Sequence, residues 1–213
     1  LGYQVESISQ RTAIATLQDN VAAPSGGLSL LAGNRLSNFT GSYGATFSER
    51  TDALLGNIIR AVVPPDRPYV WDAQLIQPIN QAVQKGDIVF VEFLIRSVTP
   101  LGSVTLLFEQ SGPPYSKSLS RGLSLTPNWV KVQAAFYADA DYVSGAARLG
   151  FHLASQGQTV EFAQFLMRNY GPSSTLTPAE GFFVNNINGV FGTMTQVSIG
   201  DPAFAQVYEL RTN

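Results

Sequence analysis

Charged side chains recur at alternate positions of short apolar segments, where they could bond a ligand. In segment 88–97, Val91, Phe93 and Ile95 form one apolar series, and the opposite series carries Glu92 and Arg96. Such alternation predicts a half-buried antiparallel strand with one dry face. Segments 104–109, 147–153 and 159–166 alternate in the same way and add four titratable groups to the series opposite the apolar one: Glu109, Arg148, His152 and Glu161.

Exposed aromatic rings would complement these groups. A flat ring can stack on the C–H face of a pyranose and exclude water, while charged side chains bond its hydroxyls. Gln74 and Gln158 could add amide contacts. We therefore predict a sugar-binding face made of Tyr69, Trp71, Gln74, Glu92, Arg96, Glu109, Tyr115, Arg148, His152 and Glu161.

The same residues also have structural interpretations. Glu92, Arg96 and Glu109 could form cross-strand ion pairs on a solvated face. The single histidine, His152, could be a hydrogen-bonded structural group. Trp129 stands at a strand start and is expected in the core, so it is left out of the predicted site.

Strand signals dominate the chain. We expect strands at 69–75, 88–97, 104–109, 129–136, 147–153 and 159–166, separated by turns rich in Gly, Pro and Ser, which indicates an all-β, antiparallel sandwich or barrel. Residues 80–85 fit a single helical turn, and 48–59 fit either a short helix or a strand. Residues 1–45 are expected to hold two or three outer strands.

Composition excludes several classes of function. The 213 residues include 45% hydrophobic and only 13% charged side chains, with a net charge of −2 and no cysteine. Disulfides, thiol nucleophiles and cysteine zinc sites are therefore excluded. Without a basic run or a basic amphipathic helix, we expect neither a nucleic-acid nor a membrane partner.

A resemblance covers about half of the chain, residues 69–169. A Lys-Gly-Asp turn at 85–87 precedes a strand ending in Arg96, and a Gln-Thr-Val strand follows at 158–160. Thr126, Trp129 and Phe136 mark the hairpin between them. This order resembles the jelly-roll carbohydrate-binding modules of the cellulose- and xylan-binding superfamily, families 4, 9, 16 and 22, which have a galactose-binding-domain-like fold.

The resemblance implies a non-catalytic module that binds a polysaccharide or oligosaccharide on a concave sheet face. It further implies a monomer, secreted or on the cell surface of a bacterium, covalently linked to a glycoside hydrolase such as a xylanase. Related modules often hold a structural calcium with an Asp two residues after the position of Glu161. Here that position is Ala163. We expect no cofactor, and a structural calcium stays open.

Two other functions stay open. A catalytic β-sandwich, a glycanase or polysaccharide lyase, would use a pair of carboxylates roughly 5 to 9.5 Å apart; a spacer would only pack against a neighbouring domain. We assign 1–171 to the sandwich. Residues 172–213, with strand patterns at 181–184, 193–199 and 203–210, either complete it or begin a further module. Because the first residue is Leu1 and not Met, we expect a processed protein or a segment of a longer one.

Overall fold

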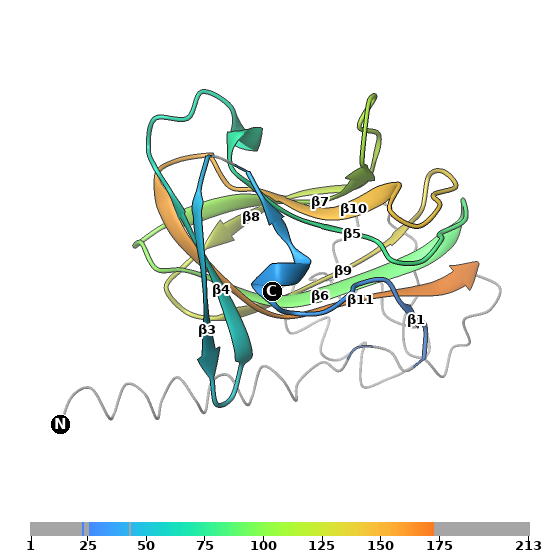
Figure 1. Ribbon diagram of the computed structural model, residues 1–213, viewed down its shortest axis with the longest axis horizontal. Helices are drawn as coiled ribbons and strands as arrows, with labels where there is room; N and C mark the ends of the chain where they lie inside the picture. The colour runs from blue at the N-terminus through green and yellow to red at the C-terminus, as the bar shows by residue number, and fades with distance from the viewer. Residues whose placement is uncertain (1–22, 24–25, 43, 173–213) are drawn as a thin grey trace, which may run out of the picture.

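Two antiparallel sheets face each other in the computed structural model, which describes residues 23, 26–42 and 44–172 (Figure 1). Sheet A has the order β3 (Thr46–Asp52), β4 (Gly56–Val63), β11 (Gln158–Pro172), β6 (Asp87–Ser97) and β9 (Val130–Tyr137), with β1 (Leu28–Ser29) pairing β11. Sheet B has the order β2 (Thr40–Gly41), β5 (Gln74–Pro78), β10 (Ala147–His152), β7 (Gly102–Gln110) and β8 (Lys117–Leu125). The expected all-β jelly-roll sandwich is confirmed.

Several successive strands lie in different sheets, whereas β3–β4 and β7–β8 are hairpins within one sheet. β6 lies in sheet A and β7 in sheet B, and β10 and β11 are divided in the same way. In Figure 1 sheet B forms the upper layer and sheet A the lower one. Among the described residues no helix is long and apolar enough to cross a membrane.

The core fills the space between the sheets. The apolar series predicted for 88–97 points inward, as do the corresponding residues of β7 and β10. The ring of Phe93 meets the edge of Phe151 with centroids 5.0 Å apart, and Phe151 lies 4.8 Å from Phe162. All three rings are fully buried. Truncating one of them to Ala would cost about 3–5 kcal/mol of stability.

Two local predictions were wrong. Residues 69–75 do not form one strand: a 3₁₀ turn, η2 (Val70–Asp72), precedes β5. The Asp72 carboxylate accepts a hydrogen bond from the Tyr69 amide, and the Asp72 amide donates to the Tyr69 carbonyl, which closes the turn. The helical turn expected at 80–85 is absent from this described segment, where Val83 bridges Tyr142 instead.

Other segments were undecided, missed or lie outside the described residues. The undecided stretch 48–59 is a hairpin of β3 and β4, turned by Asp52 and Gly56 (φ +70°). β8 was not predicted at all. Of the outer strands expected in 1–45, the described part contains β1 and β2, with a 3₁₀ turn, η1 (Leu36–Asn38), between them. The three strand patterns beyond 172 lie outside the described residues.

We expect Gly44→Ala to lower the free energy of unfolding by about 1–3 kcal/mol, as overpacked sites do. A Cβ at residue 44 would overlap the carbonyl oxygen of Asp72, so the η2 turn would have to move. Gly112→Ala is the matched control because its Cβ would meet no atom within 4 Å. Urea denaturation measures the free energy of unfolding of both variants. Equal values would show that the backbone around residue 44 accommodates a Cβ without loss of stability, against this prediction.

Candidate functional site

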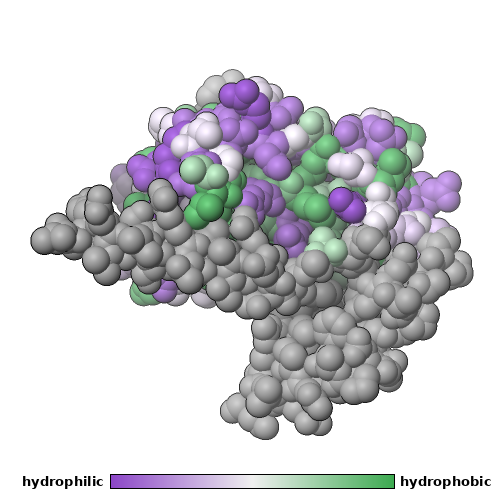
Figure 2. All heavy atoms as spheres, turned by 90° about the horizontal axis from the view of Figure 1, so that it is seen from below, coloured by the Kyte–Doolittle hydropathy of each residue, from purple (hydrophilic) through white to green (hydrophobic). Residues whose placement is uncertain are grey.

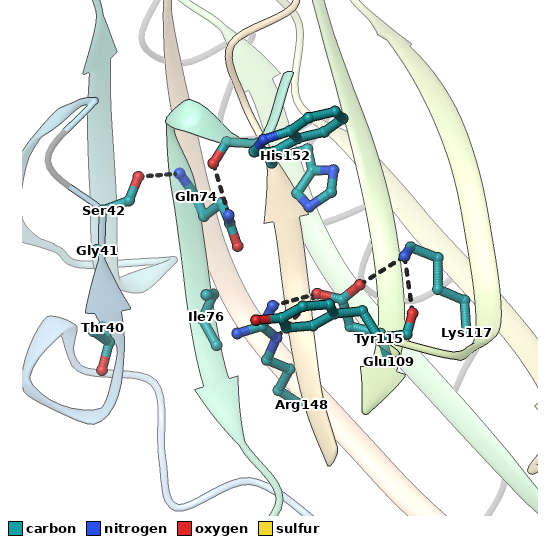
Figure 3. A pocket seen from close by; sticks show the side chains of 11 residues that line it. Thr40, Gly41, Ser42, Gln74, Ile76, Glu109, Tyr115, Lys117, Arg148 and His152 are labelled. Atoms are coloured by element: carbon teal, nitrogen blue, oxygen red, sulfur yellow. Dashed lines mark hydrogen bonds and ion pairs between the residues drawn. The ribbon is translucent and has the colours of Figure 1, made fainter. Parts of the chain in front are cut away.

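A pocket of about 520 Å³ lies on the outer face of sheet B. Its floor consists of side chains that point away from the core: Gln74 and Ile76 from β5, Arg148 and His152 from β10, and Glu109 from β7 (Figure 3). The other lining residues are Thr40, Gly41, Ser42, Trp71, Tyr115 and Lys117.

An ion triad crosses this floor. The Arg148 guanidinium donates through Nε and Nη2 to Glu109 Oε1, at 3.0 and 2.6 Å. Lys117 Nζ lies 3.0 Å from Glu109 Oε2. The three residues are cross-strand neighbours on β10, β7 and β8, and a bulge in the register after Phe108 brings Lys117 opposite Glu109. Only 2% of Glu109 is exposed, so its charge is neutralised by cations more than by water.

Trp71 forms one end of the pocket. Although it is 50% exposed, its position is fixed by neighbours. Tyr69 stacks on it with centroids 4.9 Å apart and planes at 5°, and His152 meets it at 6.4 Å in an edge-on geometry. Gln74 Nε2 donates to the Trp71 carbonyl at 2.7 Å. Trp71 lines the pocket and Tyr69 does not, so Tyr69 supports the platform.

Tyr115 stands at the other end, in the loop between β7 and β8. Its ring is 45% exposed and lies 5.7 Å from the guanidinium carbon of Arg148. The backbone has φ +57°, a left-handed conformation that is uncommon for a bulky residue. Tyr115 is thus held over Arg148 by its loop, at some cost in backbone energy.

The surroundings of His152 favour its neutral form. Burial lowers its pKa, and the positive charges of Lys117 and Arg148 lower it further, against the opposing effect of Glu109. A neutral imidazole carries one N–H donor and one acceptor nitrogen. It can therefore bond a sugar hydroxyl in either sense.

Seven of the predicted site residues come together at this pocket or directly behind its lining: Tyr69, Trp71, Gln74, Glu109, Tyr115, Arg148 and His152. Five lining residues were not predicted. Lys117 was missed with its strand; recognition of β8 would have placed it beside Glu109. Thr40, Gly41, Ser42 and Ile76 carry no alternating charge or ring that could have marked them.

The expectation that all the charged residues share one face is wrong. Glu92 and Arg96 lie on β6 and Glu161 lies on β11, both in sheet A, so their outward side is the opposite side of the sandwich. Figure 2 views the molecule from that side and shows strongly hydrophilic residues next to apolar ones. Glu92 accepts a hydrogen bond from Gln133 at 2.6 Å, and Lys131 lies 3.9 Å away.

Glu161 is a structural carboxylate. It is completely buried and accepts bonds from Arg96 at 2.6 and 2.8 Å, from Arg60 at 3.0 Å and from Arg50 at 3.4 Å. Burial alone would raise its pKa, but the hydrogen bonds and charges of these arginines bring the pKa below its ordinary value. The cluster ties β3, β4, β6 and β11 together.

Trp129 and Gln158 are also structural. Trp129 is buried (8% exposed), as expected, but it lies in a small cluster separate from the main core, and the Arg96 guanidinium lies 4.9 Å from its ring centroid. Gln158 is 3% exposed, and its side-chain amide forms hydrogen bonds with the backbone of Ser103 and Leu153. Gln158 therefore cannot reach a ligand in the sheet B pocket.

The residues around Glu161 do not fit a calcium ion. Ala163 packs in a small apolar cluster with Leu94 and Trp129 and offers no oxygen ligand from its side chain. Across the described ranges, no three acidic, histidine or cysteine side chains converge as metal ligands would.

The pocket also lacks the pair of carboxylates that glycosidases use. Glu109 is the single carboxylate among its described lining residues, and both of its oxygens face cations. The half-exposed Trp71 shows that the described loops of the chain do not fill the groove. The arrangement offers a ring platform, polar donors and a neutral imidazole, which suit binding.

Solved structures that share this fold include carbohydrate-binding modules. A family 4 module matches with a TM-score of 0.54 and 18% identity over 62% of this chain and 95% of its own. The N-terminal cellulose-binding domain of Cellulomonas fimi β-1,4-glucanase C gives 0.52 and 17%, over 67% and 97%. The CBM22-1 xylan-binding domain of Paenibacillus barcinonensis Xyn10C gives 0.50 and 12%, over 70% and 97%.

The fold is therefore the jelly roll of the cellulose- and xylan-binding modules. No protein-family model and no curated protein matches the sequence.

We expect Glu161→Gln to lower the free energy of unfolding at pH 7 by about 3 kcal/mol, because it leaves three arginines without their buried counter-charge. Arg50 and Arg60 are more than a third exposed, and water screens part of that loss. Since the folded pKa of Glu161 is lowered, its contribution is fully present above pH 4.5, the ordinary value, and is lost as pH falls below it. Urea denaturation between pH 7 and pH 3 measures both effects.

Asp66→Asn is the control, since Asp66 is exposed and should change stability by no more than about 0.5 kcal/mol. The difference in free energy of unfolding between wild type and Glu161→Gln should become smaller in acid. The difference between wild type and Asp66→Asn should stay the same at every pH. A gap that stays constant with pH would contradict the ionised state assigned to Glu161.

Proposed function

We propose that this chain is a non-catalytic carbohydrate-binding module whose sheet B pocket holds a segment of a polysaccharide or oligosaccharide. The observation that carries the proposal is Trp71, a large ring left half exposed at the end of a hollow yet fixed by Tyr69 and His152. The similar structures named for cellulose and xylan binding support the same class of ligand.

Trp71 and Tyr115 are the stacking groups of this proposal. Apolar faces of a sugar ring gain by leaving water for an aromatic surface, and an immobilised ring loses little conformational freedom on binding. Tyr69 stacks on Trp71 without lining the pocket, so the indole is oriented before the ligand arrives. Glu109 acts as a positioning residue for Arg148 and Lys117.

Polar groups fix the orientation of the sugar. Arg148, Lys117, Gln74 and His152 all line the hollow. Each bond to a hydroxyl replaces a bond to water, so its net gain is modest, and we expect modest affinity overall. The contacts mainly decide which glycan fits.

The proposed role is delivery of an attached enzyme. The similar modules include domains of a β-1,4-glucanase and of Xyn10C. We place this chain in a secreted bacterial glycoside hydrolase such as a xylanase, acting as a monomeric module. Tethering would raise the effective concentration of the enzyme on its polysaccharide.

We expect Trp71→Ala to weaken binding about ten-fold to whichever polysaccharide retains the wild-type chain in affinity electrophoresis. Loss of the stacking surface accounts for about 1–2 kcal/mol, and ten-fold in affinity corresponds to about 1.4 kcal/mol. Leu101→Ala is the control, because Leu101 is 72% exposed and does not line the pocket. If Trp71→Ala is retained as strongly as the wild-type chain, the binding site does not lie in the sheet B pocket.

Incubation of the purified chain with a polysaccharide that it binds should release neither reducing ends nor unsaturated products. A single, cation-paired carboxylate cannot provide the acid and nucleophile of glycoside hydrolysis. A reducing-end assay and absorbance of unsaturated products measure this. Turnover by the wild-type chain that disappears in Glu109→Gln would contradict this proposal and identify the chain as a catalytic sandwich.

A further inference from the structure

We propose that the glycan recognised in the sheet B pocket carries a carboxylate, that is, a uronic acid, and that Lys117 and Arg148 bind that carboxylate. This inference rests on the proposed function. It follows from the charge of the pocket, from the state of Glu109 and from the donors that the triad leaves over.

The pocket has an excess of positive charge. Its lining contains two cations, Lys117 and Arg148, and one carboxylate, Glu109, while the surroundings of His152 favour its neutral form. The difference, two minus one, is one positive charge. An uncharged sugar does not need that excess, whereas a carboxylate would neutralise it.

Glu109 has little capacity left for a ligand. One oxygen accepts both bonds from Arg148, and the other pairs with Lys117. The residue is 2% exposed, so a sugar hydroxyl cannot easily reach its remaining lone pairs. Glu109 therefore holds the two cations in place and does not compete for hydroxyl donors.

The two cations keep donors for a ligand. The ammonium of Lys117 has three N–H groups and, among the described residues, two acceptors, Glu109 and the carbonyl of Tyr115. Arg148 uses Nε and Nη2 on Glu109, and within the described part of the chain its Nη1 has no acceptor. Figure 3 shows both cations beside Glu109, with the Tyr115 ring at Arg148.

A carboxylate suits these donors better than a hydroxyl does. Bonds from a cation to an ionised oxygen are roughly twice as strong as bonds between neutral groups. General attraction to polyanions is weak here because the chain has a net charge of −2 and no basic run. Selectivity for an acidic glycan would therefore come from the pocket itself.

Matched pairs of polymers test the inference. Affinity electrophoresis is run in gels containing polygalacturonate, alginate or glucuronoxylan, each beside the same polymer with its carboxyls reduced to alcohols, and beside neutral xylan and glucan. At least one acidic polymer should retard the wild-type chain. The affinity for the reduced form of that polymer should be at least ten-fold lower. Lys117→Gln should lose about ten-fold in affinity for that acidic polymer.

Lys85→Gln is the matched control, since it removes the same charge from an exposed lysine that does not line the pocket. Equal or stronger retention by reduced or neutral polymers would overturn the inference and leave the proposed function standing. Retention by an acidic polymer that Lys117→Gln does not weaken would also overturn it, because the sheet A arginines or the general surface would then be responsible. Retention by no polymer would remove both the proposed function and the inference.

Discussion

The contact between the two sheets is the constraint on which the rest of the structure depends. Each sheet can offer one dry face to the other, and the interleaved rings of Phe93, Phe151 and Phe162 fill the space between them. The charged residues of the strands therefore point mostly outward, with Arg121 of β8 as an inward exception. Because there are two outward sides, the sandwich divides its charged residues into two separate populations.

Two buried glutamates show how differently these populations are used. Glu109 and Glu161 each lie on a central strand and each accept bonds from an arginine on a neighbouring strand. Around Glu161 three arginines converge, and the cluster serves to hold four strands together. Around Glu109 the two cations come from β10 and β8, on either side of β7, and both line a hollow, so the same kind of ion pair presents donors to solvent.

The sequence predicted the inward side of the strands well, because burial imposes a period of two on apolar residues. It could not assign strands to sheets, since strands of both sheets show the same alternation. Membership is set by pairings between distant segments, such as β6 with β11 and β7 with β10. For this reason Glu92, Arg96 and Glu161 were grouped with residues of the opposite side. β8 was missed because Arg121 interrupts its inward apolar series and serines fill its outward one.

The rings at the two ends of the pocket define a length. Trp71 contacts His152, and Tyr115 lies over Arg148 at the other end of β10. Four residues of strand separate these positions, about 13 Å at the usual rise. A strand length of about 13 Å exceeds one pyranose ring, which favours a ligand of more than one sugar unit. Affinity should therefore increase with the number of sugar units until a single ligand touches both rings. Longer ligands should bind little more tightly.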